Sequence, residues 1–314
     1  MNRLFNLIRN EHMKIYRRLR TLILALLLVV ITVLTGILSH SNDHVNDNWK
    51  TRAAETIAHN KTELTNPDIP EKFKKQMRED NAMQQYMLDH DYPPMDNTLW
   101  GGMLTAAGLV VVLTLFTVII AGDMVASEFT WGTIKLLLIR PASRSKILLS
   151  KYVTTLMFSA AFLVLLFITA LIVNGILYGF GRLGLPHLTV NAAGEVKEAS
   201  MLFHVLATYG LKLVELVMIV TLAFMISTVF RSASLAIGLS IFIMFAGNVI
   251  TLLFLRYSWG KYFLFANTDL TQYLEDQPLA EGMTMGFSIT VLLFYFLLFN
   301  VLSWEIFRRR DIAA

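Results

Sequence analysis

Six long apolar runs, separated by polar segments, dominate the pattern of this chain. Each run is continuous rather than alternating, and a helix needs about 20 residues to cross the hydrocarbon core of a bilayer. The pattern predicts membrane-spanning helices over residues 21–39, 100–122, 152–180, 205–230, 233–255 and 283–307. A β-barrel would instead need strands that alternate apolar and polar residues. We therefore expect an all-α polytopic membrane protein with six transmembrane helices.

The composition agrees with this prediction and excludes an ordinary soluble domain. Apolar residues make up 55% of the 314 residues, charged residues make up 16%, and the mean hydropathy is +0.56. No cysteine is present. Disulfides, thiolate metal sites and cysteine nucleophiles are therefore excluded.

Residues 1–20 have an amphipathic pattern. Leu4, Ile8 and Ile15 fall on one face of a helix, and basic residues surround them. This pattern predicts an interfacial helix that leads into the first span. A charged tail that only sets the topology explains the segment equally well.

The longest polar insertion covers residues 40–99. It holds two helix-like blocks, about 46–64 and 70–89, which are broken at Asn66-Pro67. We expect a small helical domain, whose sparse apolar residues would give it only a marginal core of its own. The remaining polar segments are predicted to be a loop at 123–151, a loop at 181–204, an outer or re-entrant segment at 256–282 and a tail at 308–314.

The distribution of charge predicts the orientation of the chain. Lys and Arg gather in residues 1–20, 123–151 and 308–314, whereas acidic residues prevail in the other connecting segments taken together. Cytoplasmic loops of membrane proteins carry the excess of Lys and Arg. We therefore expect both termini and 123–151 in the cytoplasm and 40–99 outside, with the chain in a cell membrane. Because the basic residues flank spans instead of forming one patch, no nucleic-acid binding is predicted.

Motifs for enzymatic chemistry are missing from the sequence. It contains no Gly-x-x-x-x-Gly-Lys-Ser/Thr phosphate loop, no His-Glu-x-x-His zinc motif and no Gly-x-Ser-x-Gly elbow. His40 and His44 lie four residues apart beside Asp43, a spacing that can hold a metal, but no further ligand supports it. We predict no catalytic residue, metal or cofactor in this chain, and expect any ATP and Mg²⁺ to be bound by another polypeptide.

Two charged residues, Lys212 and Glu215, lie within the predicted fourth span. Three residues apart, they share one helix face and can neutralise each other. Two central charges would cost about 5 to 7 kcal/mol on insertion scales. The pair must therefore be buried against protein or snorkel to the membrane surface, and it is either structural or part of a transport path.

Single amides and small residues also occur within the spans. Asn174 and Asn248 are expected to join helices by hydrogen bonds, the more frequent use of amides in membranes, or else to line a path. Gly101, Gly102 and Gly108 are expected to allow close approach of helices.

The segment between the second and third spans carries the most specific pattern. Its characteristic residues are Glu128, Phe129, Thr130, Trp131, Gly132, Thr133, Lys135, Arg140, Pro141, Arg144, Lys146 and Lys151. Gly132 and Pro141 bracket a predicted short helical block, with Glu128 at the positive end of its dipole. A basic loop that only sets topology would leave this Glu-to-Pro punctuation unexplained.

This segment resembles the first cytoplasmic loop of ABC-2 type transporter permeases. The resemblance rests on Glu128, Trp131 to Leu138, Arg140-Pro141, Ser143-Arg144 and Ile147 to Lys151, with a weaker one at Gly260 to Leu270. It implies a permease subunit of an ATP-binding cassette exporter, paired with a second permease that is identical or related. It also implies that residues 128–133, Lys135 and Arg140 belong to a coupling helix, which docks on two copies of a separate cytoplasmic ATPase.

The same resemblance implies a substrate path between two permeases. An amphipathic or lipophilic compound, such as an antibiotic or a peptide, would pass near Phe116, Phe245 and Asn248. The alternative from another class is a membrane sensor or assembly protein. In that case, residues 40–99 would bind a ligand or an envelope partner, and 123–151 would relay occupancy without transport.

Overall fold

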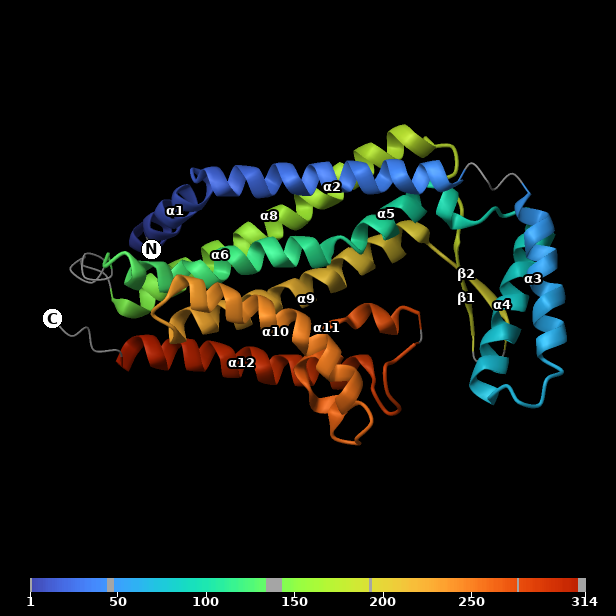
Figure 1. Ribbon diagram of the computed structural model, residues 1–314. Coiled ribbons are helices and arrows are strands. Elements are labelled where there is room, and N and C mark those ends of the chain that lie inside the picture. Colours follow the sequence, from blue (N-terminus) through green and yellow to red (C-terminus); the bar gives the residue numbers. More distant parts are fainter. Residues whose placement is uncertain (1, 44–47, 134–142, 192–193, 276, 310–314) are drawn as a thin grey trace. The chain divides into compact units, whose positions relative to one another are not determined.

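The computed structural model describes residues 2–43, 48–133, 143–191, 194–275 and 277–309 (Figure 1). Nearly all of its regular structure is helical, as the sequence predicted. The helices are α1 (Asn2–Tyr16), α2 (Leu19–Asp43), α3 (Trp49–Glu63), α4 (Glu71–His90), α5 (Leu99–Ala107), α6 (Val110–Thr130), α8 (Arg144–Tyr178), α9 (Met201–Val229), α10 (Ala233–Phe254), α11 (Leu264–Thr268) and α12 (Met285–Arg309). Short 3-10 helices, η1 (Met95–Asn97), η2 (Gly260–Tyr262) and η3 (Leu270–Tyr273), and two strands, β1 (His187–Val190) and β2 (Val196–Ala199), complete the described structure.

Six helical stretches of the described chain are long and apolar enough to cross a membrane. They are Leu19–Ser41, Leu99–Thr130, Arg144–Tyr178, Met201–Val229, Ala233–Phe254 and Met285–Arg309. Each corresponds to one predicted run, so the predicted fold class is confirmed. The second span continues to Thr130, past its predicted end at residue 122, and the third span begins at Arg144, before its predicted start at residue 152. The reason is that a helix can continue into charged sequence where an apolar run has already ended.

The chain forms two compact units. Unit 1 comprises residues 1–30, 108–166 and 209–314, and unit 2 comprises residues 31–107 and 167–208.

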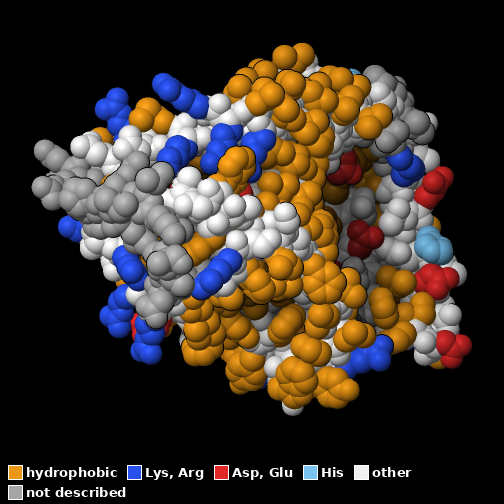
Figure 2. Space-filling view, turned by 60° about the vertical axis from the view of Figure 1, so that its left-hand side comes forward, with side chains coloured by type: hydrophobic (Ala, Val, Ile, Leu, Met, Phe, Trp, Pro, Cys, Tyr) orange, Lys and Arg blue, Asp and Glu red, His pale blue; other side chains and the backbone are white. Residues whose placement is uncertain are grey.

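Unit 1 is a helical bundle in which α6 packs along α10 (Figure 1). Close approach depends on Gly122 of α6, where a Cβ would lie 3.1 Å from the Cα of Ile237. Ser227 of α9 accepts hydrogen bonds from the backbone N–H groups of Val125 and Ala126, each at 3.0 Å. Large apolar side chains of α10 and α12 are exposed, among them Leu252 and Phe294, and hydrophobic side chains form a broad area in Figure 2. Such a surface suits contact with lipid.

The segment between α10 and α12 folds into unit 1. All five residues of α11 are buried, and α11 packs against both α10 and α12. Phe265 lies directly on Gly247 of α10, where a Cβ would come within 2.3 Å of the ring. Asn267 is also buried, and it donates hydrogen bonds to the carbonyls of Lys261 and Phe263 at 2.8 and 2.9 Å. The segment predicted as re-entrant is therefore built as short helical turns with a buried centre.

Unit 2 contains the polar insertion between the first two spans. Its helices α3 and α4 pack on each other, and Asn60 of α3 donates to Asp80 and Asn81 of α4, each at 3.0 Å. The segment 181–204, predicted as a loop, instead contains the antiparallel pair β1–β2, which packs on α4. Tyr86 of α4 donates a hydrogen bond to Glu198 of β2 at 3.1 Å. This hairpin supplies the packing surface that the sparse apolar residues of 40–99 lack.

Candidate functional site

Four ionised side chains from three helices of unit 1 form a charged cluster. Its members are Glu11 and Lys14 of α1, Glu128 of α6 and Lys151 of α8. The Lys151 Nζ donates to Glu11 Oε2 at 2.9 Å and to Glu128 Oε1 at 2.8 Å. The Lys14 Nζ donates to Glu11 Oε1 at 2.9 Å and lies 3.5 Å from Glu128 Oε1. The charged cluster therefore ties α1, α6 and α8 together at one level.

Three members of the charged cluster are largely buried, Lys14 is partly exposed, and the four charges balance. The Lys151 side chain is only 3% exposed, and both carboxylates are largely covered. Burial by itself would raise the pKa of Glu11, but the charges and hydrogen bonds of Lys151 and Lys14 outweigh it and hold that pKa below its ordinary value. Because two acids meet two bases, the charged cluster has no net charge, and removal of the buried Lys151 would leave a carboxylate charge poorly compensated.

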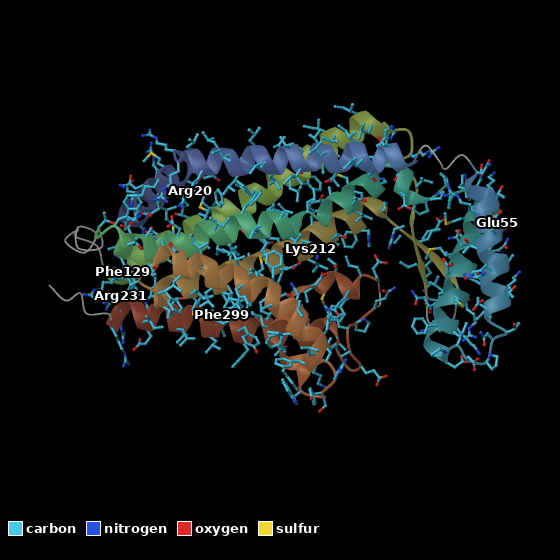
Figure 3. All side chains as sticks on the ribbon, viewed as in Figure 1. Arg20, Glu55, Phe129, Lys212, Arg231 and Phe299 are labelled. Atoms are coloured by element: carbon cyan, nitrogen blue, oxygen red, sulfur yellow. The ribbon has the colours of Figure 1, made fainter. Side chains whose placement is uncertain are left out.

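A second ion-pair group lies beside the charged cluster. Asp123 of α6 accepts a hydrogen bond from Arg18 at 2.9 Å and also pairs with Arg20, which Figure 3 labels. These arginines lie at the junction of α1 and α2, so α6 is linked to both helices. The cavity between the two groups measures about 20 Å³, room for roughly one water molecule. The two groups together link α1, α2, α6 and α8.

The charged cluster lies at the end of α6, where the chain turns. Gly132 has a φ of +68°, which a glycine adopts without strain, and its N–H donates to the Phe129 carbonyl at 3.1 Å. We call Trp131, Gly132 and Thr133 the α6 turn. The Trp131 side chain is 79% exposed, whereas Thr133 donates a hydrogen bond to Glu128. A large aromatic side chain thus projects beside buried ion pairs.

Glu128 was predicted at the positive end of a short helical block between Gly132 and Pro141, most of which lies outside the described residues. In the described structure Glu128 lies in the last turn of α6, at the negative end of that helix's dipole. The helix continues past the apolar run, and Lys151 supplies the positive charge that the dipole does not. Lys135 and Arg140 lie outside the described residues, as does Pro141.

Thr130, another predicted site residue, connects the end of α6 to the start of α10. Its hydroxyl donates to the Ala126 carbonyl at 3.1 Å, and it accepts a hydrogen bond from the N–H of Ala233 at 3.1 Å. Ala233 is the first residue of α10. The end of α6 is therefore fixed to the start of α10 as well as to α1 and α8.

The charged pair predicted in the fourth span is formed, and a third residue joins it. The Lys212 Nζ donates to Glu215 Oε2 and to Asp269 Oδ2, each at 3.0 Å. We call these three residues the charge triad, and Figure 3 labels Lys212 on α9. Asp269 follows α11 directly, 57 residues along the chain from Lys212, so no helical spacing could indicate it. Lys212 is mostly covered, and two carboxylates of the protein offset its charge.

Asp269 has its own anchoring within the charge triad. Burial alone would raise the pKa of Asp269, but hydrogen bonds from the hydroxyl and N–H of Thr271 and the charge of Lys212 lower it overall. The Thr271 hydroxyl donates to Asp269 Oδ1 at 2.6 Å and its N–H does so at 3.0 Å. The residue is thus positioned as an ionised partner for Lys212.

The residues predicted to line a substrate path differ in their burial. Phe116 of α6 is buried, whereas Phe245 and Asn248 are exposed on α10. Asn248 donates to the carbonyl of Met244 in its own helix at 3.2 Å.

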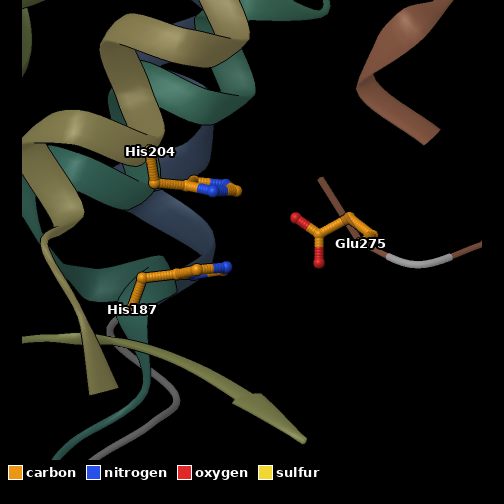
Figure 4. Close-up of side chains that lie close together, drawn as sticks. All are labelled: His187, His204 and Glu275. Carbon is orange, nitrogen blue, oxygen red and sulfur yellow. The ribbon is translucent and has the colours of Figure 1, made fainter. Parts of the chain in front are cut away.

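Histidines of unit 2 form a pair that the sequence did not indicate. The rings of His187 in β1 and His204 in α9 stack with centroids 3.7 Å apart and an interplanar angle of 21° (Figure 4). Glu275, also labelled there, belongs to unit 1. Of the two histidines whose spacing in the sequence could hold a metal, His40 packs edge-on against Tyr178, and His44 lies outside the described residues.

A family model described as "Protein of unknown function (DUF2705)" matches residues 73–313 of the chain. The chain belongs to this family. It is 39% identical over 320 residues to the uncharacterized protein YhcI of Bacillus subtilis (strain 168), covering 99% of this chain and 100% of that protein. It is also 31% identical over 222 residues to the uncharacterized membrane protein YdbK of the same organism, covering 70% of this chain and 85% of that protein.

Membership in the DUF2705 family corrects the predicted ABC-2 permease family, which was wrong. The matching family model is a different one, and the two relatives carry no transporter name. The resemblance rested on a short basic loop. A glycine that ends a helix and cations at a membrane boundary arise in any loop of that topology, so the pattern was not specific to one family.

The comparisons agree with the fold on membrane location. A relative named as a membrane protein and six apolar helices in this DUF2705 member identify a multi-pass membrane protein.

Proposed function

We propose that this chain is the transmembrane subunit of an ATP-binding cassette exporter, driven by a separate cytoplasmic ATPase that docks on the α6 turn. The observation that carries the proposal is the exposed Trp131 next to the buried charged cluster. An exposed tryptophan is typical of a contact residue at protein interfaces. A force applied at the α6 turn would move α1, α6 and α8 together, because buried ion pairs connect these helices rigidly.

The energy source in this proposal lies in another polypeptide. The sequence has no phosphate-binding loop, so ATP and Mg²⁺ would be bound by two copies of the ATPase. The α6 turn faces the cytoplasm in this proposal, in keeping with the basic residues around it and the positive-inside rule. The membrane would be the bacterial cytoplasmic membrane.

A second permease, identical or related, would complete the substrate path. An exposed amide such as Asn248 is unfavourable in lipid but well placed against another subunit. The exposed Phe245 beside it offers an apolar wall. We propose that an amphipathic or lipophilic substrate moves outward between two such faces.

Co-expression with adjacent genes, followed by purification through this chain, tests the docking proposal. Trp131→Ala should reduce the amount of co-purified ATPase at least tenfold and leave the melting temperature unchanged, since its side chain is exposed. Trp259→Ala is the matched control, because Trp259 is also exposed but lies between α10 and α11. Full retention of the ATPase by Trp131→Ala, or an active preparation that contains this chain alone, would refute the proposal.

A sensor or assembly role is the second candidate, and one observation favours it. The α3–α4 pair and the β1–β2 hairpin pack together as a small folded part of unit 2, which could recognise a ligand. Deletion of residues 44–96 separates the two functions. A sensor would lose its response to ligand, whereas an exporter would keep vanadate-sensitive ATPase stimulation.

A further inference from the structure

Asn174 of α8 is buried, and the oxygen of its side-chain amide has no hydrogen-bond donor among the described residues. Its side chain is 2% exposed, and its Nδ2 donates to the carbonyl of Ala170 in the same helix at 2.8 Å. The Oδ1 accepts no hydrogen bond from any residue that the structure describes. Asn174 therefore makes no direct hydrogen bond to another described helix, in contrast to the expected use of a membrane amide. Buried carbonyl oxygens nearly always have a donor, so a missing one calls for an explanation.

The unsatisfied oxygen lies at a small cavity inside unit 2. A Cβ on Gly102 of α5 would lie 2.0 Å from Asn174 Oδ1, so only a glycine leaves room for this oxygen. Gly36 of α2 faces the same oxygen, with a Cβ position 3.9 Å away. The other residues that line this Asn174 cavity are Thr32, Thr35, Ser39, Thr105 and Ala106.

The lining of the Asn174 cavity is polar and uncharged. It consists of hydroxyl groups, glycines, an alanine and the amide, with no ionised side chain among its residues. An ion would enter such a site without a counter-charge, which is costly away from water, whereas a neutral molecule would not. The free volume is about 10 Å³, close to what one water molecule requires.

The hydrogen bonds already made in the lining indicate what the ligand must supply. The Thr35 hydroxyl donates to the Ile31 carbonyl at 2.8 Å, so its oxygen can only accept a further bond. Asn174 Oδ1 is likewise an acceptor. A ligand that satisfies both must carry two donors, and water has two.

We propose that the Asn174 cavity binds one water molecule, which donates to Asn174 Oδ1 and to Thr35 Oγ1. This water connects α8 to α2 inside unit 2. It replaces a direct hydrogen bond to α2, which the Asn174 side chain does not make. Gly36 and Gly102 provide the space for it. The proposal stands independently of the transport function.

A double-mutant cycle tests the bridge. Asn174→Leu, Thr35→Val and the double variant are purified in detergent, and their melting temperatures are compared with the wild type. Because both side chains contact the same water, the second substitution should add little to the first, so that the two shifts are clearly non-additive. Thr290→Val, which removes the same kind of hydroxyl bond to a carbonyl four residues back in α12, should combine additively with Asn174→Leu. Additive shifts for Asn174 and Thr35 would overturn the proposal.

Two measurements on the wild type keep the test decisive if a variant does not fold. A reconstruction that resolves ordered water should show a peak within hydrogen-bond distance of Asn174 Oδ1 and Thr35 Oγ1, and an empty cavity would contradict the proposal. Melting temperatures in sodium chloride and in choline chloride at equal ionic strength should agree. A melting temperature that is higher in sodium chloride than in choline chloride would indicate a bound cation in place of water and would overturn the proposal.

Discussion

Lys151→Met is the substitution that most directly tests the charged cluster. Lys151 bridges Glu11 and Glu128 at 2.9 and 2.8 Å and is almost completely buried. Methionine fills a similar volume but carries no charge. Both carboxylates would then depend on Lys14, which is 43% exposed and lies 2.9 and 3.5 Å from them.

The expected loss follows from the burial of these groups. Breaking a buried ion pair by removing one partner costs about 3–5 kcal/mol, and the remaining contacts of Lys14 place this case near the lower end. Domains of 150 to 250 residues lose roughly 2–4 °C of melting temperature per kcal/mol. We therefore expect Lys151→Met to lower the melting temperature by about 6–12 °C at neutral pH.

The assay is thermal unfolding of the detergent-purified protein, with two comparisons. Lys146→Met removes a lysine from the same helix, but this one is exposed, so the change should stay within about 0.5 kcal/mol. The double variant Lys151→Met with Glu128→Gln should recover much of the loss, because Glu11 keeps Lys14 and no second charge is left unpaired. Equal melting temperatures for Lys151→Met and Lys146→Met, or a double variant less stable than Lys151→Met, would refute this account of the charged cluster.

Three further outcomes can be measured by the same unfolding assay. In the folded protein the pKa of Glu11 is held below its ordinary 4.5, so the stability that its ionised form contributes is complete above pH 4.5 and is lost as the pH falls through the folded pKa. Glu11→Gln should flatten this decline in stability. An equally steep decline in the variant would contradict the assigned ion pairs. Gly132→Ala should cost about 1–2 kcal/mol, since φ is +68° and no atom of the described residues lies within 4 Å of the added Cβ. Gly181→Ala, equally unobstructed but without a positive φ, should be neutral; equal effects would exclude backbone strain at Gly132. Gly102→Ala should cost about 1–3 kcal/mol, because the added Cβ would displace Asn174 Oδ1. Gly210→Ala in α9, where the added Cβ meets no described atom, should not destabilise the protein. A Gly102→Ala protein as stable as the wild type would rule out tight packing at Gly102.

Chemical labelling can place the α6 turn relative to the membrane. An engineered Trp131→Cys would be the single thiol of the chain, because the sequence has no cysteine. In intact cells it should resist a membrane-impermeant maleimide and react only after permeabilisation. Labelling of intact cells would put the α6 turn on the outer side and end the docking proposal.

Hydropathy determined the membrane fold because the energetic requirement is local. Each span must shield its own backbone within about 20 consecutive residues, so the signal is contained in a short window. The pair Lys212 and Glu215 was also within reach of a helical spacing argument, since the two residues lie three apart.

Contacts between distant segments were beyond this kind of reasoning. Asp269 joins Lys212 across 57 residues and Lys151 meets Glu11 across 140, and neither separation corresponds to any helical or strand period. The hairpin at 187–199 was missed because four-residue strands carry too little alternation to be recognised. The extent of α6 was underestimated because the boundary of an apolar run marks where the hydrocarbon ends, not where a helix does.

By itself, then, the sequence determined the number, order and helical nature of the spans, since the free energy of transfer into lipid depends on the residues of each span alone. Only the tertiary structure decided which charges far apart in the chain neutralise each other and which amide is left without a donor. Electrostatic and hydrogen-bond energies depend on distances between atoms, and for residues far apart in the chain those distances exist only in the folded protein.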